Sequence, residues 1–340
     1  MVLPNLFEKE GGKMIKIAVV GLGNLGRGVV EAVKRNPDME LVAVFTRRLA
    51  QLKKEIKVPV YHTEDKKSWS GATMIDIDVV ILCGGSKEDT PIQGPEFAKH
   101  FSTVDSFDTH TEIPAYFQKM DAAARSYGNV SIISAGWDPG IFSLERILGD
   151  AFLPQSKHYT FWGKGVSQGH SDAARKVGGV LDARQYTIPI EEAIRQVRAG
   201  QTPDFSKREM HKRLVYVVVK EGVDQEKIRQ EIANMPNYFD GYDTEVIFIT
   251  QEEMEREHSA YPHGGFVLTS GATGNGNKQV LEYRLKLESN PEFTANVLIA
   301  CARAAFRLSK VGEYGAYTML DFPLSLLSPH SPETLLSEYM

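Results

Sequence analysis

Apolar residues in the first part of the chain gather in short continuous runs, separated by stretches in which apolar residues recur at helical spacing. Runs such as Asp78 to Cys83, DVVILC, are typical of parallel strands that are buried on both faces. A helix is expected to begin at Pro91, and another from Glu112 to Tyr127 carries Pro114 in its first turn. Strands are expected at residues 17–20, 41–45, 58–61, 78–83, 103–105 and 130–134. This alternation predicts an α/β domain with a doubly wound parallel sheet.

The pattern changes beyond about residue 150. In VLEYRLKL, residues 280–287, polar Glu282, Arg284 and Lys286 alternate with apolar residues, as in a strand that has one face in water. Further strands are expected at 159–163, 185–189, 214–220, 244–250, 266–271 and 279–288, and helices at 191–198, 224–234 and 291–310. These elements predict a second, α+β domain with one open, mainly antiparallel sheet, from which the last helix can return to the first domain.

A glycine motif, GLGNLGRG, follows the first expected strand. Gly21, Gly23 and Gly26 have the spacing in which one glycine makes a tight turn, one lets a pyrophosphate approach and one lets a helix pack closely. The helix that begins around Asn24 and Leu25 would offer free backbone N–H groups to phosphate. The motif lies between two strands and therefore predicts a Rossmann-type dinucleotide-binding domain. The alternative is a tight glycine turn that binds nothing.

The end of the next strand indicates which dinucleotide binds. Domains that prefer NAD usually place Asp or Glu here for the ribose 2′-hydroxyl, whereas this chain has Thr46, Arg47 and Arg48. Guanidinium groups bind a 2′-phosphate through charge-assisted hydrogen bonds. NADP(H) is therefore the expected cofactor, and the alternative is a pair of solvated arginines. The strand of residues 78–83 ends in further candidates for cofactor contact, Cys83, Gly84, Gly85 and Ser86.

Composition and charge limit the classes of partner. A net charge of −5 and a pI near 6.0 give no electrostatic reason to expect nucleic acid or an anionic membrane, and no apolar run approaches the length that spans a bilayer. The two cysteines, Cys83 and Cys301, are far apart in apolar segments, as expected for buried thiols of a reduced, cytoplasmic protein. The histidines show no zinc-binding spacing, so no metal is expected.

The length of 340 residues suffices for two domains. Residues 1–13 contain a Gly-Gly pair and are expected to be a disordered extension. Residues 14–150 are expected to form the dinucleotide-binding domain, and residues 151–340 the substrate-binding domain.

Acidic residues follow two strands of the first domain. Asp108, in VDSFDTH, and Asp138, in GWDPG, are expected at the carboxyl edge of the sheet, where ligands bind in such folds. Two carboxylates beside a nicotinamide would attract a cationic amine. For Asp138 the alternative is an N-cap of the helix that follows Pro139.

The second domain carries polar residues of the kinds that bind a carboxylate, among which arginine is the best shaped for bidentate binding. Any one of them alone is more often structural, and His170 and Asp172 could equally cap a helix. They lie at strand ends or in glycine-rich loops: Trp162, Gln168, Gly169, His170, Asp172, Thr187, Arg213 and His263.

Several motifs together resemble a known family. They are GLGNLGRG, FTRR, LCGGS, TVDSFDTH, GWDPGIFS, TFWGKGVSQGHSDA, MPNYFDGY, PHGGF and LESNPEFTA. From about Met14 to Pro329 the chain resembles the meso-diaminopimelate dehydrogenases, which are NADP-dependent D-amino acid dehydrogenases; SQGHSDA with GWDPG is far more specific than the glycine motif. The resemblance implies a homodimer formed mainly through the second domain, and a role in lysine and peptidoglycan precursor synthesis.

The resemblance also implies the reaction, a reversible oxidative deamination at the D-centre of meso-2,6-diaminopimelate. The products are ammonia and L-2-amino-6-oxopimelate, which cyclises to tetrahydrodipicolinate. By resemblance, the D-centre amine is held by Asp108 and Asp138 beside Trp137, and one aspartate or a water accepts a proton. The D-centre carboxylate is met by the region of Trp162, Gln168 and Gly169. The distal L-centre is read by Thr187, Arg213, His263 and Asn290.

The sequence departs from the family in one loop and leaves other functions open. Family members often have Met before PHGG, where this chain reads Ser259, Ala260, Tyr261 and Pro262, which could alter the tolerance for other D-amino acids. A broader D-amino acid dehydrogenase, or another NADP-dependent reductase of the same route, is one alternative. A non-catalytic NADP-binding regulator is the other. Turnover of D-alanine or D-lysine would favour the first, and cofactor binding without turnover the second.

Overall fold

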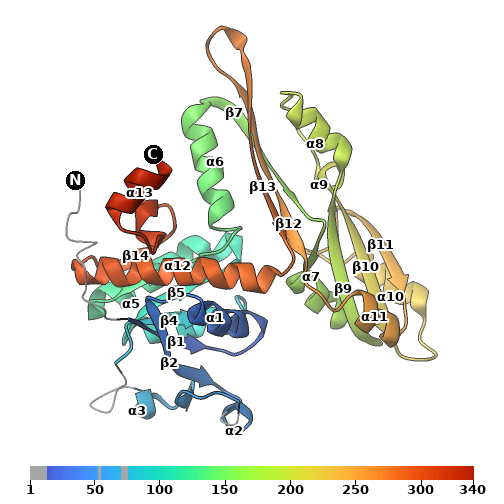
Figure 1. The fold of residues 1–340 in the computed structure, drawn as a ribbon. Helices are drawn as coiled ribbons and strands as arrows, with labels where there is room; N and C mark the ends of the chain where they lie inside the picture. The colour runs from blue at the N-terminus through green and yellow to red at the C-terminus, as the bar shows by residue number, and fades with distance from the viewer. Residues whose placement is uncertain (1–13, 53–54, 70–75) are drawn as a thin grey trace. The chain divides into compact units, whose positions relative to one another are not determined.

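The computed structural model describes residues 14–52, 55–69 and 76–340. The chain forms two compact units, each of which is described here by itself (Figure 1). Unit 1 holds the described residues up to Leu144 together with Pro291–Met340, and unit 2 is Glu145–Asn290. The expected extension, residues 1–13, lies outside the described residues.

Unit 1 is built on a sheet of seven parallel strands in the order β14-β6-β5-β4-β1-β2-β3. The strands are β1 (Ile15–Val20), β2 (Met39–Thr46), β3 (Val60–His62), β4 (Val79–Leu82), β5 (Ser102–Asp105), β6 (Val130–Ile132) and β14 (Gly315–Tyr317). Strand order proceeds outward in both directions from the β1–β4 pair, the position at which such sheets bind nucleotides. The expected doubly wound parallel sheet is confirmed, with β14 as a strand that the pattern did not predict.

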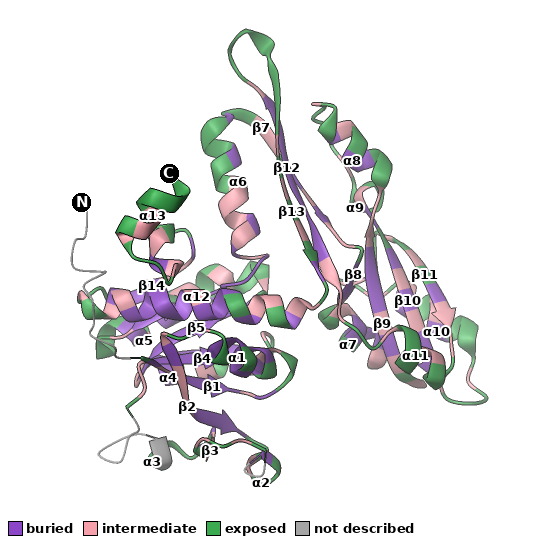
Figure 2. Ribbon diagram, viewed as in Figure 1, coloured by how far each residue is buried: buried purple, intermediate pink, exposed green. Residues whose placement is uncertain are grey.

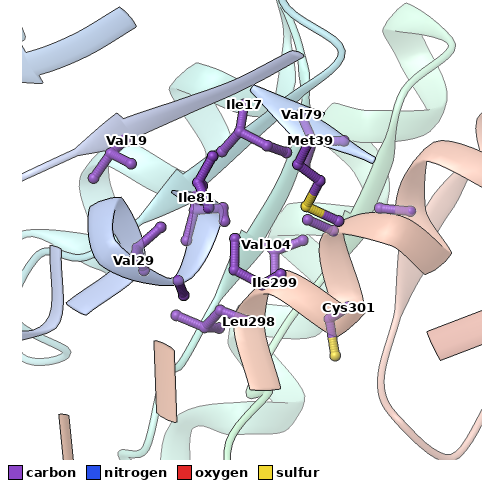
Figure 3. Close-up of a cluster of buried hydrophobic side chains, with 14 of the residues drawn as sticks. Ile17, Val19, Val29, Met39, Val79, Ile81, Val104, Leu298, Ile299 and Cys301 are labelled. Atoms are coloured by element: carbon purple, nitrogen blue, oxygen red, sulfur yellow. The ribbon is translucent and has the colours of Figure 1, made fainter. Parts of the chain in front are cut away.

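Helices cover both faces of this sheet. They are α1 (Asn24–Lys34), α2 (Leu49–Leu52), α3 (Lys66–Trp69), α4 (Thr90–Ala98), α5 (Ile113–Tyr127), α12 (Asn290–Lys310) and α13 (Pro332–Tyr339). Side chains of β1 alternate between the faces, so that Ile17 and Val19 lie in a core cluster with residues of α1 and α12 (Figure 3). Ala18 and Val20 point to the opposite face, where they pack with the aromatic ring of Phe97.

The return of α12 to unit 1 is fixed by packing and by an ion pair between buried Arg303 and half-buried Asp38. A side chain at Gly28 of α1 would lie 3.1 Å from Ala295 of α12, so the two helices are in close contact. Arg303 of α12 is 2% exposed, and its Nε donates to Asp38 Oδ2 at 2.6 Å, just before β2. This pairing lowers the pKa of Asp38 against the opposing effect of burial. The segment after residue 290 therefore lies in unit 1, and the chain passes between units within α6 (Ile141–Phe152) at residue 144.

Unit 2 contains two sheets among its described strands, where the sequence predicted one. The four-stranded sheet has the order β11-β10-β9-β8, and the three-stranded sheet has the order β13-β12-β7. All pairs are antiparallel except β10 with β11. The strands are β7 (Gln155–Trp162), β8 (Gly165–Ser167), β9 (Val180–Pro189), β10 (His211–Val219), β11 (Asp243–Phe248), β12 (His263–Ala272) and β13 (Lys278–Leu287).

The prediction of a single sheet was wrong because the chain turns sharply after β7. Gly163 has φ of +108°, a conformation that favours glycine, and β8 after this turn pairs with β9 instead of β12. The two sheets meet where Val166 N–H of β8 donates to the carbonyl oxygen of Pro262, directly before β12, at 2.8 Å. The helices of unit 2 are α7 (Gln168–Arg175), α8 (Glu191–Arg198), α9 (Lys207–Met210), α10 (Gln225–Ala233) and α11 (Gln251–Glu257).

The alternation in VLEYRLKL corresponds to β13, an edge strand of the three-stranded sheet. Its polar residues are exposed, and its apolar residues from Leu281 onward are more buried (Figure 2). The longer apolar run on β10 packs instead, together with Ala183 of β9, against residues of α7 and α10, as in a central strand.

Candidate active site

The glycine turn of unit 1 connects β1 to α1 and leaves the N-terminus of α1 open to an anion. Gly21 adopts φ of +86°, and a Cβ at Gly26 would lie 2.0 Å from Gly21 O, so neither position accepts a side chain without strain. Apart from Gly23 itself and its two chain neighbours, no described residue has an atom within 4 Å of where a Cβ of Gly23 would be. Gly23 is the N-cap, no side chain caps the helix, and no acidic residue occupies its first turn. Asn24 and Leu25 begin the helix, and this geometry fits a pyrophosphate.

The residues expected to select the phosphorylated cofactor follow β2. Arg48 is anchored to the glycine turn, because its Nη2 donates to Leu22 O at 2.8 Å. The hydroxyl of Thr46 is turned back to accept the N–H of Arg48 at 3.0 Å. Arg47 is 62% exposed, and its Nη2 lies 3.2 Å from a carboxylate oxygen of Asp89. A 2′-phosphate in this position would compete with Asp89 for Arg47.

The loop after β4 lies beside the glycine turn. Gly84 has no space for a side chain, because a Cβ would lie 2.6 Å from Cβ of Asp89. Gly85 N–H donates to the Asp89 carboxylate at 3.2 Å. Ser86 Oγ accepts the N–H of Asp108 at 3.3 Å, so the candidate cofactor loop contacts a candidate amine-binding residue.

The two cysteines differ in burial. Cys301 in α12 is buried, and Cys83 in this loop is half-buried as a whole residue, although burial raises the pKa of its thiol as well. Both thiols are free. Burial raises the pKa of Cys301 to about 12, so this thiol is protonated at neutral pH.

Asp108 and Asp138 follow the neighbouring parallel strands β5 and β6. The pairing of Thr103 with Ser131 places the carboxyl ends of these strands at the same edge of the sheet. Asp108 is exposed and Asp138 half-buried. Trp137 is 8% exposed and packs edge-on against Phe142 of α6, with ring centroids 5.2 Å apart. α6 begins at Ile141, three residues after Asp138.

In unit 2, Thr187 and Arg213 face each other across the β9–β10 pair. Arg213 is 6% exposed, its Nη1 donates to Thr187 Oγ1, and its guanidinium lies over the ring of Tyr242 at 4.1 Å. Within the described part of the chain its Nε has no hydrogen-bond partner, and Tyr242, not a carboxylate, is the group that acts on its charge. Burial lowers the pKa of Arg213. A buried cation without a carboxylate is the arrangement expected where an anionic ligand binds.

His211, two residues before Arg213, holds Trp162 in place. Its Nε2 accepts the N–H of Trp162 at 2.9 Å, and the two rings stack with centroids 5.2 Å apart. Burial, together with the charge of Arg213, lowers the pKa of His211 from 6.5 to about 3. The imidazole is therefore neutral at physiological pH, as an Nε2 acceptor must be.

His263 begins β12 and packs against β8, where Gly165 provides the space. A Cβ at Gly165 would lie 2.6 Å from the His263 ring. Gly165 is also the strand partner of Thr187, so His263, Thr187 and Arg213 lie in one region of unit 2. Asn290 begins α12, and its N–H donates to Tyr261 O at 3.0 Å.

The SQGHSD segment starts α7. Ser167 is its N-cap, and His170 Nδ1 lies 2.8 Å from Ser167 Oγ, while Asp172 pairs with Arg175 within the helix. His170 and Asp172 therefore have local structural contacts, the alternative that the sequence left open. Gln168 and Gly169 are exposed at the start of the helix.

Several residues that contact the candidate site residues were not predicted from the sequence. Tyr242, Gln185 and His211 support the unit 2 set, and Gln185 Nε2 donates to Thr187 Oγ1 at 3.3 Å. Asp105 and Tyr116 form a buried pair below the unit 1 loops. Only Asp105 carried a signal, because an acidic residue inside a buried strand is unusual.

Residues 14–52, 55–69 and 76–340 contain no group of three or more His, Cys, Asp or Glu placed to hold a metal ion. Over the same ranges, every helix is too short or too polar to cross a membrane.

A parallel sheet with a glycine turn for pyrophosphate, and arginines at the end of β2, fits the dinucleotide-binding domain of an oxidoreductase. Comparison with known proteins narrows this class. The chain matches the model of the diaminopimelic acid dehydrogenase C-terminal domain over residues 136–289. The meso-diaminopimelate D-dehydrogenase of Ureibacillus thermosphaericus is 56% identical over 329 residues, which is 96% of this chain and 99% of that protein.

Solved structures agree. The DAP dehydrogenase of C. glutamicum in complex with DAP is 44% identical, with a TM-score of 0.89 over 96% of this chain and 99% of that one. An engineered D-amino acid dehydrogenase bound to NADP⁺ is 42% identical, with a TM-score of 0.86 over 96% of this chain and 100% of that one. The chain belongs to the meso-diaminopimelate D-dehydrogenase family.

Proposed function

We propose that this protein catalyses the NADP-dependent oxidative deamination of the D-centre of meso-2,6-diaminopimelate. The products are ammonia and L-2-amino-6-oxopimelate, which cyclises to tetrahydrodipicolinate, and the reaction is reversible. The observation that carries this proposal is the identity of 56% to a curated meso-diaminopimelate D-dehydrogenase across 96% of the chain.

The geometry of unit 1 fits NADP. The open N-terminus of α1 binds the pyrophosphate, with Gly23 as the point of closest approach. Arg47 and Arg48 bind the 2′-phosphate. When bound, the nicotinamide supplies the hydride acceptor. Gly84, Gly85 and Ser86 pass near the cofactor, as their position after β4 and beside the glycine turn supports.

Asp108 and Asp138 hold the ammonium group of the D-centre, with Trp137 beside it. Their position after adjacent parallel strands supports this role. The deprotonated amine is needed for the C–N bond to become an imine as hydride leaves carbon, and a carboxylate or a water it positions accepts the proton. Water then adds to the imine carbon, and ammonia leaves.

Unit 2 supplies recognition of the carboxylates and of the distal L-centre. Arg213 and Thr187, with His263 and Asn290, read the L-centre, and the buried guanidinium supports this assignment. Trp162, Gln168 and Gly169 meet the D-centre carboxylate. A site that hydrogen-bonds both groups of the L-centre discriminates against the wrong isomer, because that isomer leaves buried polar groups unpaired.

Family membership also supports three wider proposals. The protein is a homodimer, formed mainly through unit 2, it acts in the cytoplasm, and it serves lysine and peptidoglycan precursor synthesis. Size-exclusion chromatography with light scattering tests the first, because a monomeric mass would contradict it.

Steady-state assay of NADP⁺ and NAD⁺ reduction with meso-, LL- and DD-diaminopimelate tests the activity. Turnover is expected with the meso isomer and NADP⁺. Asp138→Asn is expected to abolish most of this turnover, whereas Asp150→Asn, at an exposed position of α6, leaves it unchanged. Comparable turnover of D-lysine or D-alanine would indicate the broader dehydrogenase, and cofactor binding without turnover the regulator.

A further inference from the structure

The last residue of β5, Asp105, is an acid with no exposed surface. Its carboxylate accepts three hydrogen bonds. Oδ1 accepts the backbone N–H groups of Phe107 and Ser134, each at 3.0 Å, and Oδ2 accepts the hydroxyl of Tyr116 at 2.7 Å. Burial raises the pKa of Asp105, against the effect of these three hydrogen bonds. Burial of a carboxyl group lowers the stability of the folded state unless its hydrogen bonds compensate, so a residue of this kind suggests a specific role.

The two backbone groups on Oδ1 belong to different loops. Phe107 directly precedes Asp108, and Ser134 begins the loop that leads to Trp137 and Asp138. Ser134 has φ of +54°, a conformation that residues other than glycine seldom adopt. The hydrogen bond from Ser134 N–H to Asp105 stabilises this unusual backbone conformation, at which the chain changes direction after β6.

We propose that Asp105 is a positioning residue, whose single oxygen Oδ1 holds the Asp108 loop and the Asp138 loop in one fixed relation. This inference rests on the proposed function, in which those aspartates hold the substrate amine. Asp105 itself does not touch the substrate, because its carboxylate is enclosed by its own partners.

The surroundings of Asp105 keep the carboxylate in one orientation. Tyr116 comes from α5, and its ring packs on Phe107 with centroids 4.3 Å apart. Space for the Tyr116 hydroxyl exists because residue 94 of α4 is glycine, where a Cβ would lie 2.2 Å from that oxygen. Two helices and two loops therefore converge on one carboxyl group.

The same pair of strands offers a matched control. Thr103 Oγ1 donates to Ser131 Oγ at 2.8 Å, a buried bond that also joins β5 to β6 but lies before the loops begin. Thr103→Val removes a buried hydrogen bond between these strands without touching either loop. If the effect came from weaker pairing of β5 with β6, Asp105→Ala and Thr103→Val would both lower activity. If it came from the position of the aspartates, only the Asp105 substitution would.

The test compares Asp105→Ala, Asp105→Asn and Thr103→Val with the wild-type protein. Asp105→Ala is expected to lower kcat/KM for meso-diaminopimelate on the order of 100-fold, the scale expected for misplaced catalytic groups. The KM for NADP⁺ should stay unchanged. Asp105→Asn keeps a carbonyl oxygen for both N–H groups, and is expected to recover at least half of that loss on a logarithmic scale. Thr103→Val should keep the wild-type kcat/KM.

Hydrogen exchange provides a readout that does not depend on turnover. In Asp105→Ala the amides of residues 106–109 and 133–138 are expected to exchange faster together, and in Thr103→Val they are not. If Asp105→Ala does not fold, Tyr116→Phe keeps the ring packing and removes the bond that orients the carboxylate. This variant should lower kcat/KM by about tenfold, the value of one hydrogen bond.

Three outcomes overturn the positioning role: wild-type kcat/KM in Asp105→Ala, equal losses in Asp105→Ala and Thr103→Val, or loss in Asp105→Asn as large as in Asp105→Ala. Unchanged activity of Tyr116→Phe overturns it where that variant is the one measured. An inactive wild-type protein with normally protected loops overturns the proposed function and, with it, this inference. An active wild-type protein with an unaffected Asp105→Ala variant overturns this inference alone.

Discussion

Arg213→Met is the substitution that tests carboxylate recognition most sharply, because it should weaken substrate binding and stabilise the protein at once. Methionine has a similar length and no charge. Arg213 is 6% exposed, forms no ion pair with a described carboxylate, and donates one N–H to Thr187. A guanidinium has five N–H donors, so enough remain for two hydrogen bonds to a substrate carboxylate.

The magnitude follows from these bonds. Each charge-assisted hydrogen bond contributes roughly 1.5–3 kcal/mol. Two such bonds are lost in the variant, and water that hydrogen-bonds the substrate carboxylate in their place offsets part of the loss. The net loss of about 3–4 kcal/mol corresponds to a rise in the KM for meso-diaminopimelate of about 100- to 1,000-fold. The KM for NADP⁺ should not change. Without substrate, removal of an unpaired buried cation is expected to raise the free energy of unfolding by about 1–3 kcal/mol, and Tm by several degrees.

Arg229→Met is the matched control. Arg229 also lies over an aromatic ring of unit 2, Phe248 at 5.2 Å, but its Nε donates to Glu226 at 3.2 Å. This control should leave both KM values unchanged and should not raise Tm. Steady-state kinetics and thermal denaturation of both variants give the result. An unchanged substrate KM in Arg213→Met would show that no carboxylate meets this residue, and a lowered Tm would refute the cost assigned to the buried cation.

The remaining predictions concern the cofactor site and His211. Arg47→Ala should raise the KM for NADP⁺ by about 10- to 100-fold, as expected for one lost charge-assisted bond to phosphate, and leave that for NAD⁺ unchanged; equal effects on both would contradict 2′-phosphate binding. Gly23→Ala should keep the wild-type Tm but lose NADP⁺ binding in calorimetry, whereas Gly26→Ala, whose Cβ would lie 2.0 Å from a backbone oxygen, should lower Tm even without ligand. The pKa of His211 is lowered from 6.5 to about 3 in the folded protein. Between these two pH values the imidazole is protonated in the unfolded chain and neutral in the folded chain. His211 therefore does not reduce the free energy of unfolding above pH 6.5, but reduces it by up to about 1.4 kcal/mol per pH unit as the pH falls toward 3. His211→Gln, which keeps an acceptor for Trp162 N–H, should flatten that loss in urea titrations across this range, and an unchanged slope would contradict a buried neutral imidazole.

Local pattern predicted the parts of the molecule in which neighbours along the chain determine the structure. The strand, glycine turn and helix from Ile15 to Lys34 form as expected, because each glycine has a requirement that its own neighbourhood sets. Buried runs such as residues 78–83 likewise identified the parallel strands. Candidate residues at strand ends followed from the rule that parallel strands share one carboxyl edge.

Features that depend on packing between distant segments were not predictable in this way. The split of unit 2 into two sheets depends on how β8 pairs after Gly163, and short β8 has no distinctive pattern. The partners of Asp105 lie at residues 107, 116 and 134, which only the assembled sheet and α5 bring together. The role of His211 as an acceptor for Trp162 depends on β10 reaching the end of β7.

In the proposed reaction hydride leaves the D-centre of meso-diaminopimelate for NADP⁺, and deuterium transfer tests this step most directly. Two preparations of the meso isomer are needed, one with deuterium on the α-carbon of the D-centre and one with deuterium on that of the L-centre. Mass spectrometry of the reduced cofactor should show deuterium only from the D-centre preparation. Deuterium from the L-centre preparation, or reduced cofactor without deuterium from the D-centre preparation, would contradict the account.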